Sequence, residues 1–287
     1  MIPKNSKKII LNSLKIGISL VLLFFVFRKI PFSEVASLWR TLHLEFLVLG
    51  ALFFLVSQII SAKRLDYFFV ANGFHLDFKS NLRLYFLGMF YNFFIPGGIG
   101  GDAYKVYLLN KNFSWSAKKL TASLFVDRLS GLLAIGLIIC ILGFIALPDF
   151  KYYFIPIFIL GLAVGYFLIT KLVSGSKPLF WRTLALSVLV QLLQIVCFVF
   201  LLKSLSVEAG FYKYALLFLA SSVLSLVSFA GIGIREMLFL QASKYFSFEP
   251  QFSVSASLLF TVITAFFSLI GLYFQLTKLN LKKNEFH

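Results

Sequence analysis

The sequence predicts an all-α polytopic membrane protein with about six spanning helices and two re-entrant hairpins. The first observation is composition: of 287 residues, 60% are hydrophobic and 13% are charged, with a mean hydropathy of +0.93. Soluble domains of this length lack such a composition, whereas apolar runs of about 20 residues cross a bilayer. The second is a pair of short apolar segments that run into glycines, and the third is the distribution of Lys and Arg.

Eight apolar segments follow one another, joined by short polar connections, so we expect a single transmembrane domain over 1–287 and no soluble domain. We expect the first segment to be a retained helix rather than a signal peptide, because no small-residue cleavage site follows it. The segments are 9–29, 44–62, 84–96, 120–147, 153–170, 183–202, 214–229 and 254–277.

The third and seventh segments are short and end in helix breakers. Residues 92–102 read Asn-Phe-Phe-Ile-Pro-Gly-Gly-Ile-Gly-Gly-Asp, and residues 229–236 read Phe-Ala-Gly-Ile-Gly-Ile-Arg-Glu. Broken backbone at membrane depth is tolerated only where it is buried in protein or lines a cavity. Apolar segments of about 10–14 residues are also too short to span the bilayer easily, and they fit re-entrant segments better. We therefore expect both stretches to be hairpin tips.

The formal net charge of +16 is typical of loops held beside anionic lipid, so we do not expect a nucleic-acid partner. If all eight segments cross, 14 Lys and Arg lie inside and 12 outside. If the third and seventh segments instead fold back to the side from which they entered, 18 Lys and Arg lie inside and 8 outside, with Arg128 left within the membrane. This bias favours the hairpins, and it predicts a cell-membrane protein with both termini in the cytoplasm.

An internal repeat is the fourth indication of hairpins. Gly98-Ile99-Gly100 recurs as Gly231-Ile232-Gly233, and this match aligns the first half of the chain with the second. The predicted repeats are 9–147 and 153–280, each with three crossings and one hairpin. Because three is odd, the second copy enters the membrane inverted, and inverted repeats with broken helices are typical of transporters.

The first tip supplies the first candidate binding residues. Pro96 removes a backbone donor, while Gly100 and Gly101 permit a sharp return. We expect Asp102 to begin the return arm as its N-cap, with the free N–H groups beside it forming an anion site. Alternatively, Asp102 only caps its own helix. Asn92 lies on the first arm, from which it could face the pathway.

Asp127 and Arg128 lie inside an apolar segment, where burying either charge costs roughly 2.5–3.5 kcal/mol. One interpretation is an ion pair, for example between Arg128 and Asp102, or snorkelling of Arg128 to the surface. The other is that Arg128 binds an anionic headgroup, because a guanidinium matches a phosphate. Lys63, Arg64 and Asp66 are expected to snorkel at a membrane edge.

Arg235 and Glu236 occupy the second tip. They could neutralise one another, or they could form the other half of the same pathway. Ser221, Ser225 and Ser228 lie at helical spacing before this tip. That polar stripe is consistent with pathway lining or with packing by small residues.

Catalytic constellations are absent from the sequence, so we expect neither an enzyme, nor a metal, nor a cofactor. Cys140 and Cys197 lie in apolar runs and are expected to be packing residues.

Three motifs together resemble a known family. They are Asn92-x-x-x-Pro96-x-x-x-Gly100-Gly101-Asp102, then Asp127-Arg128-x-x-Gly131, then Gly231-x-Gly233-x-Arg235-Glu236. The set is similar to the flippase-like transmembrane region of lysylphosphatidylglycerol synthases and to related stand-alone membrane proteins. The resemblance implies movement of a lipid and makes Asp102, Arg128, Arg235 and Glu236 candidate functional residues.

Full synthases append a soluble aminoacyl-transferase domain, so synthase activity is not expected here. The leading hypothesis is a flippase-like transporter of an anionic or polar-headgroup lipid across the cytoplasmic membrane. The alternative is a non-transporting membrane subunit that scaffolds a separate lipid or glycan enzyme. The expected partners are membrane lipids, with a lipid-modifying enzyme as a further possibility.

Overall fold

The computed structural model describes residues 24, 32–94, 100–225, 233–277 and 279–284. These residues are almost entirely helical, with one isolated β-bridge between Leu76 and Lys283. The elements are α2 (Phe32–Arg40), α3 (Leu44–Ala71), α4 (Phe78–Phe94), α5 (Gly100–Phe113), α6 (Ala117–Ala146), η1 (Pro148–Phe150), α7 (Lys151–Leu172), η2 (Ser174–Leu179), α8 (Phe180–Ser204), α9 (Phe211–Leu224), α10 (Ile234–Phe246) and α11 (Pro250–Leu276).

Five of the described helices are long and apolar enough to cross a membrane: α3, α6, α7, α8 and α11. Each has 22 residues or more, which at about 1.5 Å per residue exceeds the thickness of the hydrocarbon core. These helices confirm an all-helical, multi-pass membrane protein. The predicted first crossing, 9–29, lies outside the described residues apart from Phe24.

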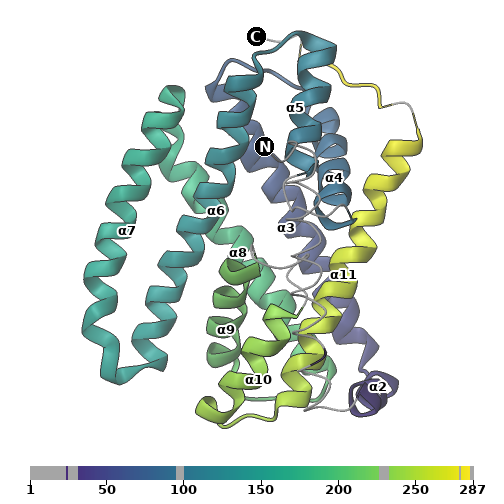
Figure 1. The fold of residues 1–287 in the computed structure, drawn as a ribbon, viewed down its shortest axis with the longest axis vertical. Coiled ribbons are helices and arrows are strands. Elements are labelled where there is room, and N and C mark those ends of the chain that lie inside the picture. Colours follow the sequence, from purple (N-terminus) through teal and green to yellow (C-terminus); the bar gives the residue numbers. More distant parts are fainter. Residues whose placement is uncertain (1–23, 25–31, 95–99, 226–232, 278, 285–287) are drawn as a thin grey trace, which may run out of the picture.

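Four shorter helices form two pairs at opposite ends of the molecule (Figure 1). Helix α4 packs against α5 in the upper half of the view, and α9 packs against α10 in the lower half. Helices α3, α6 and α11 run along most of the length beside them. Of the predicted tips, 92–102 and 229–236, the parts at 95–99, which include Pro96, and at 229–232 lie outside the described residues.

Backbone hydrogen bonds tie the connections together at each end. At the upper end, the N–H of Asp77 donates to the carbonyl of Lys282 at 3.0 Å. At the lower end, the N–H of His43 donates to the carbonyl of Ser204 at 3.0 Å. The chain after α11 therefore returns to the turn between α3 and α4, on the side opposite the turn that follows α8.

Helix boundaries recur in the two halves of the chain at the spacing that separates Gly98 from Gly231. Positions at this spacing are called equivalent below. The equivalent boundaries are the ends of α3 and α8 (Ala71 and Ser204), the starts of α4 and α9 (Phe78 and Phe211), the ends of α5 and α10 (Phe113 and Phe246) and the starts of α6 and α11 (Ala117 and Pro250).

The turns that end α3 and α8 are also alike in detail. The N–H of Phe74 donates to the carbonyl of Phe69 at 2.9 Å, and the N–H of Val207 donates to that of Leu202 at 3.0 Å. This six-to-one bond is the mark of a Schellman turn, which places the preceding residue in the left-handed region. That residue is Gly73 (φ 81°) in the first turn and Ser206 (φ 65°) in the second.

Two packed regions hold the short pairs in place. In the second half of the chain, the rings of Phe218 and Phe239 stack on Phe198 with centroid distances of 4.7 and 5.4 Å. All three side chains are buried, and such pairs add about 0.5–1.5 kcal/mol each to their area burial. In the first half, buried leucines such as Leu84 and Leu109 join α4 and α5 to α3 and α6. Each pair is thus fixed against the long helices.

Candidate functional site

Helices α4 and α5 cross where two glycines meet. A Cβ on Gly101 would lie 2.0 Å from the carbonyl oxygen of Gly88, so only glycine allows this approach. The N–H of Gly101 donates to Oδ1 of Asn92 at 2.9 Å, which joins the last turn of α4 to the start of α5. Asn92 and Gly101 therefore meet, and Gly100 is the first residue of α5.

Asp102 does not cap α5, so that prediction was wrong. The helix begins at Gly100, which places Asp102 in its first turn. Its carboxylate instead accepts a hydrogen bond from Nε of Arg128 on α6 and lies 3.4 Å from Nζ of Lys105. The predicted ion pair between Arg128 and Asp102 is therefore present. The side chain of Arg128 keeps 39% of its surface exposed, against 6% for Lys105.

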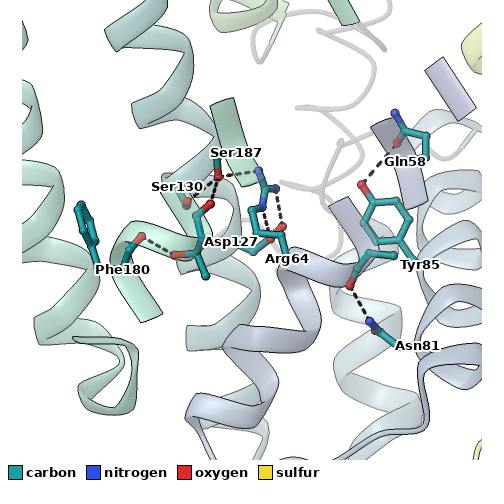
Figure 2. A network of polar contacts seen from close by, with 10 residues as sticks. Gln58, Arg64, Asn81, Tyr85, Asp127, Ser130, Phe180 and Ser187 are labelled. Carbon is teal, nitrogen blue, oxygen red and sulfur yellow. Dashed lines mark hydrogen bonds and ion pairs between the residues drawn. The ribbon is translucent and has the colours of Figure 1, made fainter. Parts of the chain in front are cut away.

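Asp127 pairs with Arg64 rather than with its neighbour. Nε and Nη2 of Arg64 donate to the two carboxylate oxygens at 2.7 and 3.1 Å, and Nη1 donates to Oγ of Ser187 at 3.0 Å. Figure 2 shows Arg64 directed from α3 toward Asp127 and Ser187. Bidentate, charge-assisted contacts of this kind are among the strongest that a guanidinium makes. This network joins α3, α6 and α8.

The expectation that Arg64 snorkels at a membrane edge was wrong. Arg64 is buried because Asp127 and Ser187 supply its partners inside the bundle. Gly131 lies beside the guanidinium, since a Cβ there would be in ordinary van der Waals contact with Nη1 at 3.4 Å. Lys63 behaves differently: it is 44% exposed and pairs with Asp66 at 2.8 Å.

Sequence reasoning also missed Lys105 and Tyr85. The Lys105 ammonium lies 4.9 Å from the centroid of the Tyr85 ring, and the Tyr85 hydroxyl donates to Gln58 at 3.4 Å. Lys105 follows Asp102 by three residues, a spacing that places both on one helix face and could have identified it. The sequence around Tyr85 carries no comparable signal.

These side chains surround a polar cavity of about 300 Å³ between α3, α4, α5, α6 and α11. Its lining holds three cations and two carboxylates, so it carries a surplus positive charge. Thr264 and Ser268 of α11 add hydroxyl groups. The full lining is Arg64, Tyr85, Met89, Asn92, Phe93, Asp102, Lys105, Leu124, Asp127, Arg128, Thr264 and Ser268.

An apolar crevice of about 440 Å³ lies beside this cavity, between α5 and α6. It is lined by side chains such as Ala103, Val106 and Phe125. The cavity and the crevice share Asp102, Leu124 and Arg128. The ion pair between Asp102 and Arg128 therefore stands between a polar space and an apolar one.

Arg235 and Glu236 do not line this cavity, and they do not pair with each other. Glu236 accepts hydrogen bonds from the N–H of Gly233 at 2.7 Å and from the Ser257 hydroxyl at 2.6 Å. Nε of Arg235 donates to Oγ of Ser221 at 3.3 Å. The two side chains therefore make no direct ion pair: Glu236 caps α10, while its charge still acts on the neighbouring Arg235 through space.

The described helices and their polar cavity define a multi-pass membrane protein with a charged site inside the bundle. The chain belongs to the family described as the lysylphosphatidylglycerol synthase TM region, whose model matches residues 12–271. This membership confirms the resemblance seen in the three motifs and relates the protein to lipid handling in membranes. A search of curated proteins found no match. Within the described residues, no group of His, Cys, Asp and Glu side chains could hold a metal ion.

Proposed function

We propose that this protein moves a lipid with an anionic or polar headgroup across the cytoplasmic membrane. The observation that carries the proposal is the shared wall of the cavity and the crevice at Asp102 and Arg128. A lipid has a polar headgroup joined to apolar chains, and it needs two such spaces side by side. The headgroup would occupy the cavity while an acyl chain lies between α5 and α6.

The surplus charge of the cavity supports an anionic headgroup. Arg64 and Asp127 form a closed, buried pair, which leaves Lys105 and Arg128 sharing the carboxylate of Asp102. A phosphate would compete with Asp102 for the Arg128 guanidinium, since both anions fit its planar fork. The protein would then act by binding and release, without a chemical step on the lipid.

The helix boundaries support two repeats, 9–147 and 153–280. The equivalent positions cover the paired helices, α4 with α9 and α5 with α10. We propose that each pair is a re-entrant hairpin and that the two enter from opposite sides, because they lie in opposite halves of the molecule (Figure 1). Transporters with inverted repeats expose a central site alternately to the two sides.

The distribution of basic residues supports an orientation. Lys79, Lys111, Lys118 and Lys282 belong to the turns and helix ends at the α3–α4 end of the molecule. We propose that this end is cytoplasmic, because cytoplasmic loops carry the excess of Lys and Arg. Both termini would then lie in the cytoplasm, and the turn between α8 and α9 would lie outside.

A scaffold remains the second candidate, and one observation favours it. Arg64, Asp127 and Ser187 form a closed network, as a purely structural role predicts. The polar cavity of about 300 Å³ beside Arg128 instead favours transport, since a scaffold does not require a cavity lined by charged side chains.

Transport can be measured in proteoliposomes that contain fluorescent phosphatidylglycerol, by chemical quenching of outer-leaflet headgroups. We expect wild type to expose inner-leaflet lipid faster than protein-free liposomes, and Arg128→Met to lose most of that rate. Arg182→Met is the matched control, because Arg182 is exposed and stacks on Tyr67 at 4.5 Å, away from the cavity lining. Wild type at the protein-free rate would contradict transport. Arg128→Met at the wild-type rate would contradict this site.

A further inference from the structure

We propose that residues 9–29, the predicted first crossing, pack along an exposed apolar face of α11, as α7 packs along α6. The inference rests on the two repeats of the proposed function and does not depend on lipid transport. The face in question lies opposite the hydroxyl groups that α11 turns to the polar cavity. We call it the α11 stripe; its residues are 46–66% exposed, and they are Val262, Phe266, Leu269 and Tyr273.

The same face of α6 is covered by a helix. The positions equivalent to the α11 stripe are Leu129, Leu133, Gly136 and Cys140, and they line a groove together with residues of α7. A Cβ on Gly165 of α7 would lie 2.5 Å from the Leu133 side chain, so the two helices are in close contact there. Figure 1 shows α7 running beside α6 along most of its length.

The outward faces of α3 and α8 show how a face that meets lipid behaves in this repeat. Val56 and Ile59 of α3 are 44% and 37% exposed. The equivalent residues of α8, Leu189 and Leu192, are 41% and 46% exposed. These two faces are therefore open in both halves, whereas the α11 stripe is open and its counterpart on α6 is covered. This difference indicates that the α11 stripe has a helix as its occupant.

The path of the chain indicates which helix this is. Helix α2 lies beside the lower end of α11 (Figure 1), where Nε1 of Trp39 donates to Oγ of Ser255 at 2.7 Å. The chain before Phe32 thus leads into α2 near that end of α11. Residues 9–29 span roughly 30 Å as a helix at about 1.5 Å per residue, enough to follow the α11 stripe. They also precede α2 and α3 in the first repeat, as α7 precedes η2 and α8 in the second.

The sequence of the segment has a face that fits the α11 stripe. Apolar residues recur at alternating intervals of three and four, at Leu11, Leu14, Ile18, Val21 and Phe25. The polar residues Asn12, Lys15 and Ser19 recur on a different face. The α11 stripe has the same alternation of intervals, which is the pattern by which two helices pack side by side. In a membrane such packing depends on close van der Waals contact.

This placement bears on the polar cavity. Asp127 and Arg128 line the cavity from α6, and Thr264 and Ser268 line it from α11. Helix α7 supports α6 from the outer side, and residues 9–29 would give α11 the same support. Both long helices that face the cavity would then be held from behind by the helix that begins a repeat.

Disulfide cross-linking in native membranes tests the placement. The background lacks Cys140 and Cys197 and carries a protease site inserted after Glu208, in the exposed turn that follows α8. Ile18→Cys is combined with Phe266→Cys, because both residues lie near the middle of their segments. We expect oxidation with copper phenanthroline to keep the two protease fragments together. Thr264→Cys is the matched control at the same depth on the opposite face of α11, and it should not join Ile18→Cys.

Thermal unfolding in detergent gives a second measurement that needs no cross-link. If residues 9–29 cover the α11 stripe, Leu269→Ala removes packed side-chain atoms, and we expect the Tm to fall by several degrees. Leu160→Ala is the matched control, because Leu160 lies on the exposed side of α7. That variant should leave the Tm almost unchanged.

The inference fails if neither Phe266→Cys nor Leu269→Cys joins Ile18→Cys, or if Leu269→Ala is as stable as Leu160→Ala. Joining through Thr264→Cys alone would place the segment on the cavity side of α11 and overturn the proposal. Cross-linked dimers of the single variant Phe266→Cys would assign the α11 stripe to a second copy and also overturn it.

Failure of the proposed function would be distinguishable. Wild type that moves lipid in liposomes while the cross-link is missing would reject this placement and leave transport standing. A protein that forms the cross-link and moves no lipid would keep the placement and reject transport.

Discussion

Asp102 and Arg128, 26 residues apart in the chain, form an ion pair that joins the start of α5 to the middle of α6. The pair lines both the polar cavity and the apolar crevice. Its carboxylate also contacts Lys105, so one anion is shared by two cations from two helices. The first prediction concerns this shared anion.

Replacing Asp102 with Asn should tighten the binding of anionic lipid while lowering thermal stability. The change removes the carboxylate that competes for Arg128, and it leaves the buried Lys105 without its counter-ion, a loss of about 3–5 kcal/mol for a fully buried pair. Native mass spectrometry with phosphatidylglycerol measures the first effect, and thermal unfolding measures the second. Asp149→Asn, an exposed change, should alter neither. Unchanged lipid binding in Asp102→Asn would show that the carboxylate does not compete with the lipid for Arg128.

The Arg64–Asp127 pair should behave as a coupled unit. Either Arg64→Met or Asp127→Leu leaves one buried charge unpaired, and each should lower the free energy of unfolding by about 3–5 kcal/mol. The double variant should lose less free energy of unfolding than the two single variants lose together, because it contains no unpaired buried charge. Denaturant unfolding in detergent measures the cycle. Lys63→Met, which breaks the half-exposed pair with Asp66, should cost under about 1 kcal/mol. Additive losses would mean that the two side chains act independently.

Gly101→Ala should disrupt the crossing of α4 and α5. The new Cβ would lie 2.0 Å from a backbone oxygen of Gly88, which cannot rotate away, so we expect a loss of about 1–3 kcal/mol or more. Gly136→Ala is the matched control, because no atom lies within 4 Å of its Cβ position in α6. That variant should gain about 0.5–1 kcal/mol from helix propensity. Thermal melting of the two proteins side by side measures both, and equal stability would reject the close crossing.

The orientation proposed for the two hairpins predicts which side of the membrane each turn faces. In a variant without Cys140 and Cys197, a cysteine at Lys111 should react with impermeant maleimide only from the cytoplasmic side. A cysteine at Glu208, in the turn after α8, should react only from outside. Both residues are exposed, so access depends on sidedness. Labelling of position 111 from outside would mean that α4 and α5 do not form a hairpin on the cytoplasmic side.

The sequence predicted the helix class, the helices on either side of residues 95–99 and the contact between Asp102 and Arg128. Those features depend on apolar length, on helix breakers and on the cost of a charge in lipid, all of which are local. It placed Arg64 wrongly because the second segment was ended at 62, at its first charges. Helix α3 continues to Ala71, so Arg64 lies two turns inside it and meets a partner 63 residues away. Helix α2 was not predicted, although Val35, Leu38 and Trp39 recur at helical spacing, because only long apolar runs were taken as segments.

The equivalent Schellman turns after α3 and α8 can be compared to choose substitutions for protein engineering. The same backbone turn is built with glycine at position 73 and with serine at position 206, both in the left-handed region. A side chain in that region carries a penalty of about 1 kcal/mol, which glycine avoids. Each half of this chain therefore suggests substitutions for the other, and we expect Ser206→Gly to stabilise the turn after α8 to the extent that relief of this backbone strain exceeds the entropic cost of glycine.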